Sequence, residues 1–370
     1  MKLAIISPQE NAYSESFIQA HRLITPDTLY YFGGFMPQYL DGHGALLKSF
    51  CNSYMVNYIA NVVGNPRLLV YPKSFSREQR ILAESFRKNG VTHVLAEFGN
   101  CAVEVMNVCA FLNIKLISHF HGYEISKFEM IRAYLDRYKE LFAISYRVVA
   151  VSKLMQNNLL NLGCPAEKIL YCPCGPNDKL LDVKPTFDND NILYIGRFVD
   201  KKAPYDLILA FVKVLEKIPS ATLTMIGVGE LLDCCKQLVS YYGISDSVHF
   251  EGVVDHDSVS SYFEKASLYC QPSARASSGD QEGTPVSVME ASLSSLPVVA
   301  TNHAGIPDVI INGETGCLVN EHDVLGMSEA IIKLLCDKEA AKSMGTNGRN
   351  YVKDNFMLSV SLGRLRQIVG

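Results

Sequence analysis

Short apolar runs rich in β-branched residues recur along the 370-residue chain, and longer segments with helical periodicity separate them. The runs are apolar at consecutive positions, which is typical of strands buried on both faces. Strands of this kind, alternating with helices, predict parallel sheets that helices cover on both sides. The chain therefore belongs to the α/β class, and its length accommodates two domains of ordinary size.

The predicted strands form two groups, one in each half of the chain. They are 2–7, 93–98, 115–120, 147–152 and 168–173, with 68–72 as a further candidate, and then 191–196, 221–227, 247–252, 267–272 and 296–301. The predicted helices are 101–112 and 124–142 in the first half, and 203–217, 229–242, 257–265, 285–294 and 322–336 in the second. Each group predicts a doubly wound unit. The polar segment 176–191, which holds two prolines, is the predicted boundary.

The net charge of −4 gives no indication of nucleic-acid binding. The charge is divided unevenly: residues 1–180 carry 18 Lys+Arg against 14 Asp+Glu, a balance of +4, and residues 181–370 carry 16 against 24, a balance of −8. A basic first half makes an anionic membrane surface or an anionic acceptor a candidate partner, and a solvated surface with no partner is the alternative. The segment 127–142, where basic and aromatic residues mix, is the candidate membrane contact, although its aromatic spacing also fits a core helix.

Eleven cysteines, an odd number, are scattered through apolar runs, which is typical of a reduced compartment. Their spacings do not match a zinc site. The five-residue apolar stretch at the N-terminus is too short for a signal peptide, and no apolar run approaches the ~18–20 residues of a spanning helix. We therefore expect a cytoplasmic protein that contacts a membrane, if at all, at the inner face.

The stretch "EGTPVSVMEASLSSLPVVAT" begins with one glutamate, Glu282, and holds a second, Glu290, eight positions later. Thr284 is predicted as the N-cap of the helix and Pro285 as its first residue. The N–H groups of Gly283, Thr284 and Val286 then form an anion site at the helix start. Glu290, inside the helix, is placed to accept from a vicinal diol. A capping charge and a surface glutamate are the structural alternative.

Three further features follow predicted strands. Arg197 and Lys202 lie five positions apart after 191–196 and can clamp a diphosphate, or be solvated basic residues in a turn. His121, after 115–120, can donate to a sugar hydroxyl or a phosphate, and His119 lies on the same face or in the core. Gly227, in "MIGVGE", allows close approach of a ligand.

Other chemistries are weakly indicated. The first predicted strand leads into "SPQENAYSESF" without a glycine, which argues against a dinucleotide-binding domain and an NAD-dependent oxidoreductase. The Asp-x-Asp pattern at 188–190 lies in the predicted boundary and reads as a solvated turn rather than a metal site.

Taken together, these stretches resemble glycosyltransferase family 4, whose members have the GT-B fold. "NILYIGRFVDKKAP" and "EGTPVSVMEASLSSLPVVATNHAGIPDVIINGETGCLV" are similar to the two donor-site blocks of that family in order and spacing. "FHGYE" resembles its first-domain His-Gly-Tyr-Asp segment, and "AYSESFI" with "KKAP" is typical of members that build exopolysaccharide, colanic acid or O-antigen. Two departures are Ser295 in place of a glycine and Glu124 in place of an aspartate.

The resemblance implies two Rossmann-like domains facing each other across a cleft. They are 1–180 on the acceptor side and 181–348 for the nucleotide sugar, with 349–370 as a helix crossing back to the first. It also implies roles for single residues. Arg197 and Lys202 would hold the diphosphate, with Lys201 as an adjacent competitor, and Glu282 would bind the sugar hydroxyls. Glu290 would bind the ribose, and Gly283, Thr284, Pro285 and Val286 would line the donor site together with Gly227. His121 would meet the sugar from the opposite domain.

The implied activity is a retaining, metal-independent transfer of a hexose from a UDP- or GDP-sugar to a glycan or lipid-linked glycan. No cofactor is expected beyond the donor, which is a substrate. A sugar phosphorylase, a nucleotide-sugar epimerase and a non-catalytic glycan-binding relative are the alternatives on the same fold. The sequence does not identify the base, the sugar, the acceptor or the oligomeric state.

Overall fold

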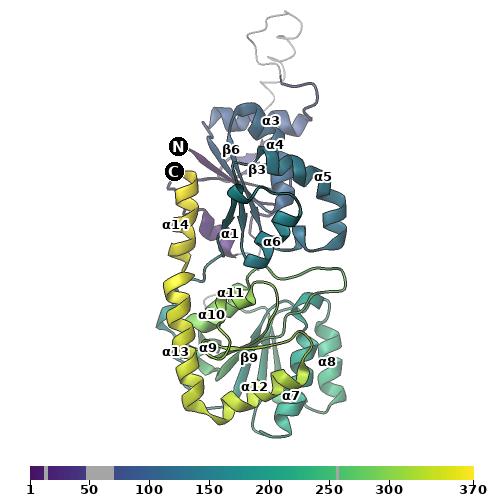
Figure 1. Cartoon of the computed structure of the whole chain (residues 1–370), viewed down its shortest axis with the longest axis vertical. Coiled ribbons are helices and arrows are strands. Elements are labelled where there is room, and N and C mark those ends of the chain that lie inside the picture. The colour runs from purple at the N-terminus through teal and green to yellow at the C-terminus, as the bar shows by residue number, and fades with distance from the viewer. Residues whose placement is uncertain (12–15, 47–70, 256–257) are drawn as a thin grey trace, which may run out of the picture.

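The computed structural model describes residues 1–11, 16–46, 71–255 and 258–370. Two α/β domains lie one above the other along the long axis of the molecule, each built on one sheet with helices on both faces (Figure 1). The candidate strand at 68–72 and the first residue of the helix predicted at 257–265 fall partly or wholly outside the described residues.

The first sheet has the strand order β4-β3-β2-β1-β5-β6-β7-β8. Its strands are β1 (Leu3–Ile6), β2 (Leu29–Phe32), β3 (Tyr39–Leu40), β4 (Gly44–Ala45), β5 (His93–Glu97), β6 (Lys115–Phe120), β7 (Arg147–Ala150) and β8 (Ile169–Tyr171). Neighbours are parallel except for the β2–β3 and β3–β4 pairs, which add an antiparallel ribbon at one edge.

The second sheet is parallel throughout and has the order β11-β10-β9-β12-β13-β14. Its strands are β9 (Asn191–Ile195), β10 (Thr222–Ile226), β11 (Val248–Gly252), β12 (Leu268–Gln271), β13 (Val298–Thr301) and β14 (Cys317–Val319). The chain builds outward from β9 in one direction and resumes on its other side at β12. The ends of β9 and β12 therefore flank the crevice where doubly wound sheets bind ligands.

Helices connect the strands in both domains. The first domain has α1 (Ser16–His21), α3 (Arg77–Lys88), α4 (Gly99–Leu112), α5 (Phe128–Ile144) and α6 (Lys153–Asn161). The second has α7 (Pro204–Leu215), α8 (Leu232–Tyr241), α9 (Val259–Lys265), α10 (Val286–Leu293), α11 (Ile306–Val309), α12 (Val324–Cys336) and α13 (Lys338–Asn355), and α14 (Leu358–Val369) ends the chain. Short 3-10 turns lie at η2 (Tyr123–Ile125), η3 (Ala166–Lys168), η4 (Asp178–Asp182), η5 (Asp200–Lys202) and η6 (Ser245–Ser247).

Each sheet buries side chains on both faces, as consecutive apolar residues in its strands require. In β1, Ala4 and Ile6 pack into one cluster while Leu3 and Ile5 pack into another on the opposite face. The same division in the second domain gives two further clusters, one against α7 and α12 and one against α9, α10 and α13.

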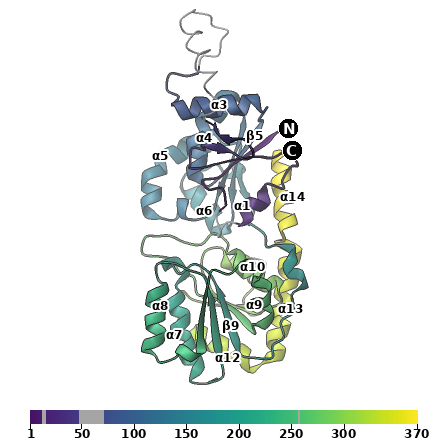
Figure 2. The same cartoon turned by 180° about the vertical axis from the view of Figure 1, so that it is seen from behind.

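The C-terminal helices connect the two domains along one side of the molecule (Figure 2). α13 contributes Val352 to the core of the second domain, and α14 places Leu362 and Leu365 against Leu3 of the first sheet. The link is tight at Gly175, where an added Cβ would lie 2.3 Å from the Phe356 carbonyl oxygen. α14 is therefore part of the first domain's core, although it follows the second domain in sequence.

Several boundaries differ from the sequence-based expectation. The helix expected at 124–142 is a 3-10 turn followed by α5 from Phe128, whose N–H bonds the Ser278 carbonyl of the other domain. α10 has Pro285 as its N-cap position, with no side-chain cap, so the prediction of Thr284 as N-cap was wrong. The hydroxyl of Thr284 instead donates to the Val151 carbonyl at 2.6 Å.

Some elements were not predicted, and the longest of them is α13, which packs on the second domain and contains 349–355 of the helix expected at 349–370, so that the crossing to the first domain begins only at α14. The next longest is α3. Strands β2 and β14 and helices α1, α6 and α11 are the others of note. Among the described residues, no helix is long and apolar enough to cross a membrane.

Candidate active site

The carboxyl ends of β9 and β12 bring together the residues that the sequence singles out in the second half of the chain. Arg197 and Lys202 follow β9, and Glu282 lies in the loop from β12 to α10. Glu290 is on the second turn of α10 and is nearly buried, which excludes the surface alternative.

Lys202 and Glu282 form an ion pair, with 2.9 Å between Nζ and Oε1 and side chains only 11% and 9% exposed. The Ser273 hydroxyl lies 3.3 Å from the same carboxylate oxygen. Both contacts engage Oε1, and Oε2 has no hydrogen-bond partner among the described residues. Glu282 therefore holds its lysine with one oxygen and keeps the other available.

The electrostatics of Glu282 follow from this environment. Burial would raise the pKa of its carboxyl, but Lys202 and Lys201 outweigh burial and lower that pKa to about 2. The group is therefore a carboxylate at any pH near neutrality, fit to accept hydrogen bonds and not to donate a proton.

Lys201 has a different position from its neighbour. Its ammonium lies 3.1 Å from Asp280 and 3.2 Å from the Gln281 carbonyl oxygen. Both partners belong to the loop before α10, so Lys201 braces that loop from the side of β9. This engagement disfavours the role of competitor for a diphosphate.

Arg197 is exposed, and within the described parts of the chain its guanidinium makes no ion pair. Its carbonyl accepts from the Tyr194 hydroxyl at 3.0 Å, which fixes the backbone but leaves the side chain free to turn. The two cations predicted to form a clamp thus differ: Lys202 is held by an ion pair, whereas Arg197 is exposed and makes no ion pair among the described residues.

A buried chain of polar side chains lies beneath Glu282, and the sequence analysis missed it. Tyr269 donates to Gln271 Oε1 at 2.8 Å, and Gln271 Nε2 donates to Ser273 at 2.9 Å. Gln271 and Ser273 are fully buried. The available signal was "YCQPS", in which a glutamine interrupts a strand that is otherwise apolar on both faces.

His303 and Glu321 anchor the backbone of Glu282. The Glu282 N–H donates to His303 Nε2 at 3.2 Å, so His303 carries its proton on Nδ1 and donates it to Glu321 at 2.6 Å. These two hydrogen bonds fix the backbone of Glu282. Neither His303 nor Glu321 was predicted.

The backbone around Gly283 has the properties expected of an anion site. Within the described residues, the N–H groups of Gly283, Thr284 and Val286 have no hydrogen-bond partner. They lie at the start of α10, whose dipole favours a negative charge there.

Gly227 is required for packing. Its φ is +135°, and an added Cβ would lie 2.0 Å from the Gly196 carbonyl oxygen. It lets the loops after β9 and β10 touch, which shapes the floor of the site behind Arg197.

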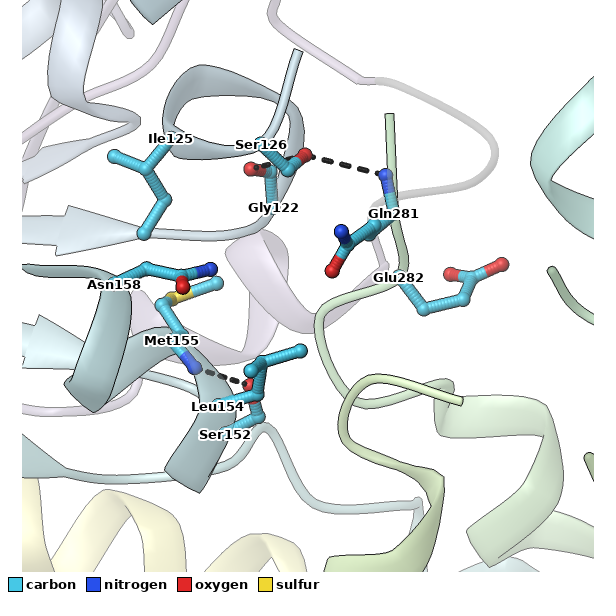
Figure 3. Close-up of a pocket in the computed structure, with 9 residues that line it drawn as sticks. All are labelled: Gly122, Ile125, Ser126, Ser152, Leu154, Met155, Asn158, Gln281 and Glu282. Atoms are coloured by element: carbon cyan, nitrogen blue, oxygen red, sulfur yellow. Dashed lines mark hydrogen bonds between the residues drawn. The ribbon is translucent and has the colours of Figure 1, made fainter. Parts of the chain in front are cut away.

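The loop before α10 also forms the contact between the domains. The Thr284 hydroxyl bonds the Val151 carbonyl, and the Gln281 N–H donates to Ser126 at 3.2 Å. Outside the loop, the Lys153 N–H donates to Asp308 of α11 at 2.7 Å. Figure 3 shows Gln281 beside Ser126, while the Glu282 side chain points away from this contact. The backbone of the loop therefore faces the first domain, and its carboxylate faces the second.

A cavity of about 480 Å³ opens beside this contact. One wall comes from α5 and α6, with Phe128 and Asn158, and the other from loops of the second domain, with Arg275 and Asn302. Arg275 lies over the Phe128 ring at 5.2 Å. An interdomain space with polar and aromatic walls is of the kind that binds ligands.

His121 lies at the end of β6, directly above the loop. An added Cβ at Gly283 would lie 2.3 Å from the His121 carbonyl oxygen, so the two segments are in contact. The imidazole Nε2 lies 2.8 Å from Glu97 Oε2, and Glu97 also contacts His21 and His119. His119 and His121 were singled out in the sequence, but the cluster itself, with His21 and Glu97, was not predicted, because its members come from three separate segments.

Glu124, the departure noted above, is buried and accepts the N–H groups of His121 and Gly122, at 3.0 and 2.8 Å. It fixes the turn after β6. An aspartate at this position would have to make the same contacts with a side chain one methylene shorter.

Two groups of side chains have the donor types of a metal site, with their ligand atoms within 4.8 Å of one another. They are His21, Glu97 and His119, and His119, His121 and Cys174. Neither group includes the predicted donor-site residues Lys202 and Glu282. The expectation of a metal-independent reaction stays a prediction.

The second domain matches a known family. Residues 181–351 match the family model described as "Glycosyl transferases group 1". The chain is 28% identical over 258 residues to the amylovoran biosynthesis glycosyltransferase AmsK of Erwinia amylovora, which covers 69% of this chain and 63% of that protein. It is 25% identical over 252 residues to the GDP-mannose-dependent alpha-(1-6)-phosphatidylinositol monomannoside mannosyltransferase of Mycobacterium tuberculosis, covering 64% and 65%. Both matches span less than two thirds of the relative.

Solved structures share the whole architecture. Anabaena Alr3699/HepE in complex with UDP superposes with a TM-score of 0.79 at 15% identity, over 100% of this chain and 99% of the other. Sucrose-phosphate synthase from Thermosynechococcus elongatus gives a TM-score of 0.72 at 19% identity, over 100% and 98%. At these identities the likeness concerns the fold, and it confirms the predicted GT-B arrangement of two Rossmann-like domains.

Proposed function

We propose that the protein is a retaining glycosyltransferase, because its residues 181–351 match the family model of the group 1 glycosyl transferases. It transfers a hexose from a nucleotide-diphosphate sugar, with UDP or GDP as the leaving group, to a glycan or lipid-linked glycan in cell-surface polysaccharide synthesis. The relatives named for amylovoran and phosphatidylinositol mannoside synthesis support this class of acceptor. The UDP bound by the HepE neighbour supports the class of donor.

The arrangement around Glu282 carries the proposal. One carboxylate oxygen holds Lys202. Among the described residues the other oxygen has no partner, and neither do three backbone N–H groups at the start of α10. In the proposed complex, the open oxygen accepts from the donor sugar's hydroxyls and the N–H groups receive the phosphate. Glu290 binds the ribose on the same helix.

The diphosphate develops negative charge as its bond to the anomeric carbon of the donor sugar breaks. Lys202, fixed next to the sugar site, and Arg197, turning in from solvent, stabilise that charge together with the helix start. Stabilisation by permanent cations and N–H groups supplies what a divalent ion supplies elsewhere, so the proposed reaction needs no metal.

The protein is expected to work in the cytoplasm, at the inner face of the membrane where lipid-linked acceptors are elongated. The basic balance of residues 1–180 supports contact of the first domain with anionic lipid. Flotation with vesicles containing anionic lipid tests this part, and an absence of salt-sensitive binding would remove it.

Turnover tests the proposal as a whole. The protein is incubated with UDP- and GDP-hexoses in excess chelator, with water as the acceptor. NMR follows release of the nucleoside diphosphate and the anomeric proton coupling of the released hexose, recorded before mutarotation. We expect release of the nucleoside diphosphate with one donor, and retention of configuration in the product. Glu282→Gln should abolish this release, whereas Glu264→Gln, at an exposed glutamate of the same domain, should not. Inversion of configuration, or equal turnover in both variants, would contradict the proposal.

A further inference from the structure

The His121 imidazole is held in one orientation by its surroundings. The Phe17 and Phe98 rings lie at 4.8 Å from its ring, centroid to centroid, and its backbone N–H is fixed by Glu124. Its side chain is 7% exposed, and its carbonyl lies against Gly283 of the second domain. The freedom that these contacts leave is a flip of the ring about the Cβ–Cγ bond. That flip decides which nitrogen faces the cleft.

Glu97 fixes this choice. Its Oε2 lies 2.8 Å from His121 Nε2, and its Oε1 lies 2.6 Å from His21 Nδ1. Glu97 is fully buried, and no lysine or arginine forms an ion pair with it among the described residues. Its carboxylate is therefore stabilised by imidazoles alone, and Nε2 of His121 must be the protonated nitrogen that donates to it.

His119 completes the cluster from below. Its Nδ1 lies 3.1 Å from Glu97 Oε2, but neither ring nitrogen has a hydrogen bond of good geometry. Burial lowers the pKa of His119 to about 3, so this ring is neutral. It therefore does not compete with His121 for the proton or for the carboxylate.

The backbone beside the cluster is strained. Phe98, directly after Glu97, has φ 72° and ψ 140°, an unfavourable conformation for an aromatic residue. Strain of this kind persists where the surrounding structure requires it. Here it places the Phe98 ring against His121 while the preceding carboxylate reaches Nε2.

We propose that Glu97 is a positioning residue that acts through His121: it binds Nε2, so that the imidazole presents unprotonated Nδ1 to the cleft as an acceptor for a hydroxyl of the transferred sugar. The inference rests on the proposed function for the sugar contact, but the orientation of His121 is a property of the protein without substrate. The specific addition is that the orientation of His121 depends on Glu97, a buried carboxylate of the same domain.

The orientation is tested first without any substrate. In ¹⁵N-histidine NMR spectra of the full chain in alkaline buffer, we expect His121 as the Nε2–H tautomer, and a mixture of tautomers in Glu97→Gln, whose amide can also donate. A predominant Nδ1–H tautomer in the wild type would overturn the proposal. This result does not depend on whether the protein transfers sugar.

The consequence for catalysis is tested by a double-mutant cycle. We expect Glu97→Gln to lower kcat about tenfold or more with the donor KM changed less than threefold, and Glu84→Gln, the same change at a half-exposed site of the first domain, to leave both unchanged. In the His121→Ala background, Glu97→Gln should change kcat less than twofold.

Equal effects of Glu97→Gln in both backgrounds, or a wild-type kcat in either single variant, would overturn the positioning role. If the wild-type protein turned over none of the donors, the proposed function would be contradicted. The NMR result would still decide the orientation of the His121 imidazole. Melting temperatures of all variants separate a loss of folding from a loss of turnover.

Discussion

The two domains hold their central buried carboxylates in different ways. Glu282 of the second domain is compensated by lysines, whose charge is permanent near neutral pH. Glu97 of the first domain is contacted by three histidine side chains and, among the described residues, forms no ion pair with a lysine or arginine. In both cases burial alone would raise the pKa of the carboxyl; the lysines lower it at Glu282 and the contacts with imidazoles lower it at Glu97, so both groups are ionised.

The difference separates two tasks. Permanent cations suit a site that must attract and stabilise a diphosphate. Imidazoles suit a site that must present one nitrogen of defined protonation to a neutral sugar. In the proposed complex, the second domain would supply charge and the first would supply the direction of a hydrogen bond.

The largest expected effect comes from the cations that the comparison assigns to charge stabilisation. Arg197→Ala and Lys202→Ala should each lower kcat/KM by about 10²–10³, since each removes one stabilising partner of the leaving group. Steady-state kinetics with the preferred donor measure this. Lys201→Ala is the matched control on the adjacent residue: because its ammonium braces the loop at Asp280, it should affect stability more than turnover. A larger kinetic loss in Lys201→Ala than in Lys202→Ala would reverse our assignment.

An effect of intermediate size concerns stability against pH. The folded pKa of Glu282, about 2, is lower than its ordinary value near 4.5, so its ionised form stabilises the fold above pH 4.5. That contribution, roughly 3 kcal/mol by linkage, is lost as pH falls from 4.5 to 2. The difference in unfolding free energy between the wild type and Glu282→Gln should therefore shrink over this window. Urea titrations at several pH values measure it, and a constant difference would contradict the ion-pair account.

The smallest expected effect concerns the contact between the domains. Thr284→Val leaves the buried Val151 carbonyl without its partner and should cost about 1–3 kcal/mol of stability, while Thr284→Ser keeps the hydroxyl. Thermal unfolding of the two variants measures this. Because Thr284 does not cap α10, the loss should appear as weaker coupling of the domains, with two transitions replacing one, and not as lower helix content. Equal stability of both variants would mean that this hydrogen bond contributes nothing.

The sequence predicted the second domain better than the first, for physical reasons. Arg197, Lys202 and Glu282 lie at the ends of strands in contiguous motifs, so knowledge of the sheet brings them together. Thr284 was misassigned because the usual preference for an N-cap is local, whereas its partner Val151 is 133 residues away in the chain.

The Glu97 cluster could not be read from the sequence. His21, Glu97 and His121 come from α1, β5 and the end of β6, and only the order of the strands makes them neighbours. β2 was missed because it has only four residues and the helix before it, α1, has only six, too few to show a clear helical period. α14 could be placed on the first domain only through the resemblance.

The most direct test of the central claim, that the second domain holds a nucleotide-sugar donor at Glu282, is isothermal titration calorimetry with UDP- and GDP-hexoses and with the free diphosphates. The account predicts that the wild type binds one nucleotide sugar, that Arg197→Ala weakens nucleotide sugar and free nucleotide alike by about tenfold or more, and that Glu282→Gln weakens only the nucleotide sugar. Absence of binding in the wild type, or unchanged affinity for the nucleotide sugar in Glu282→Gln, would contradict it.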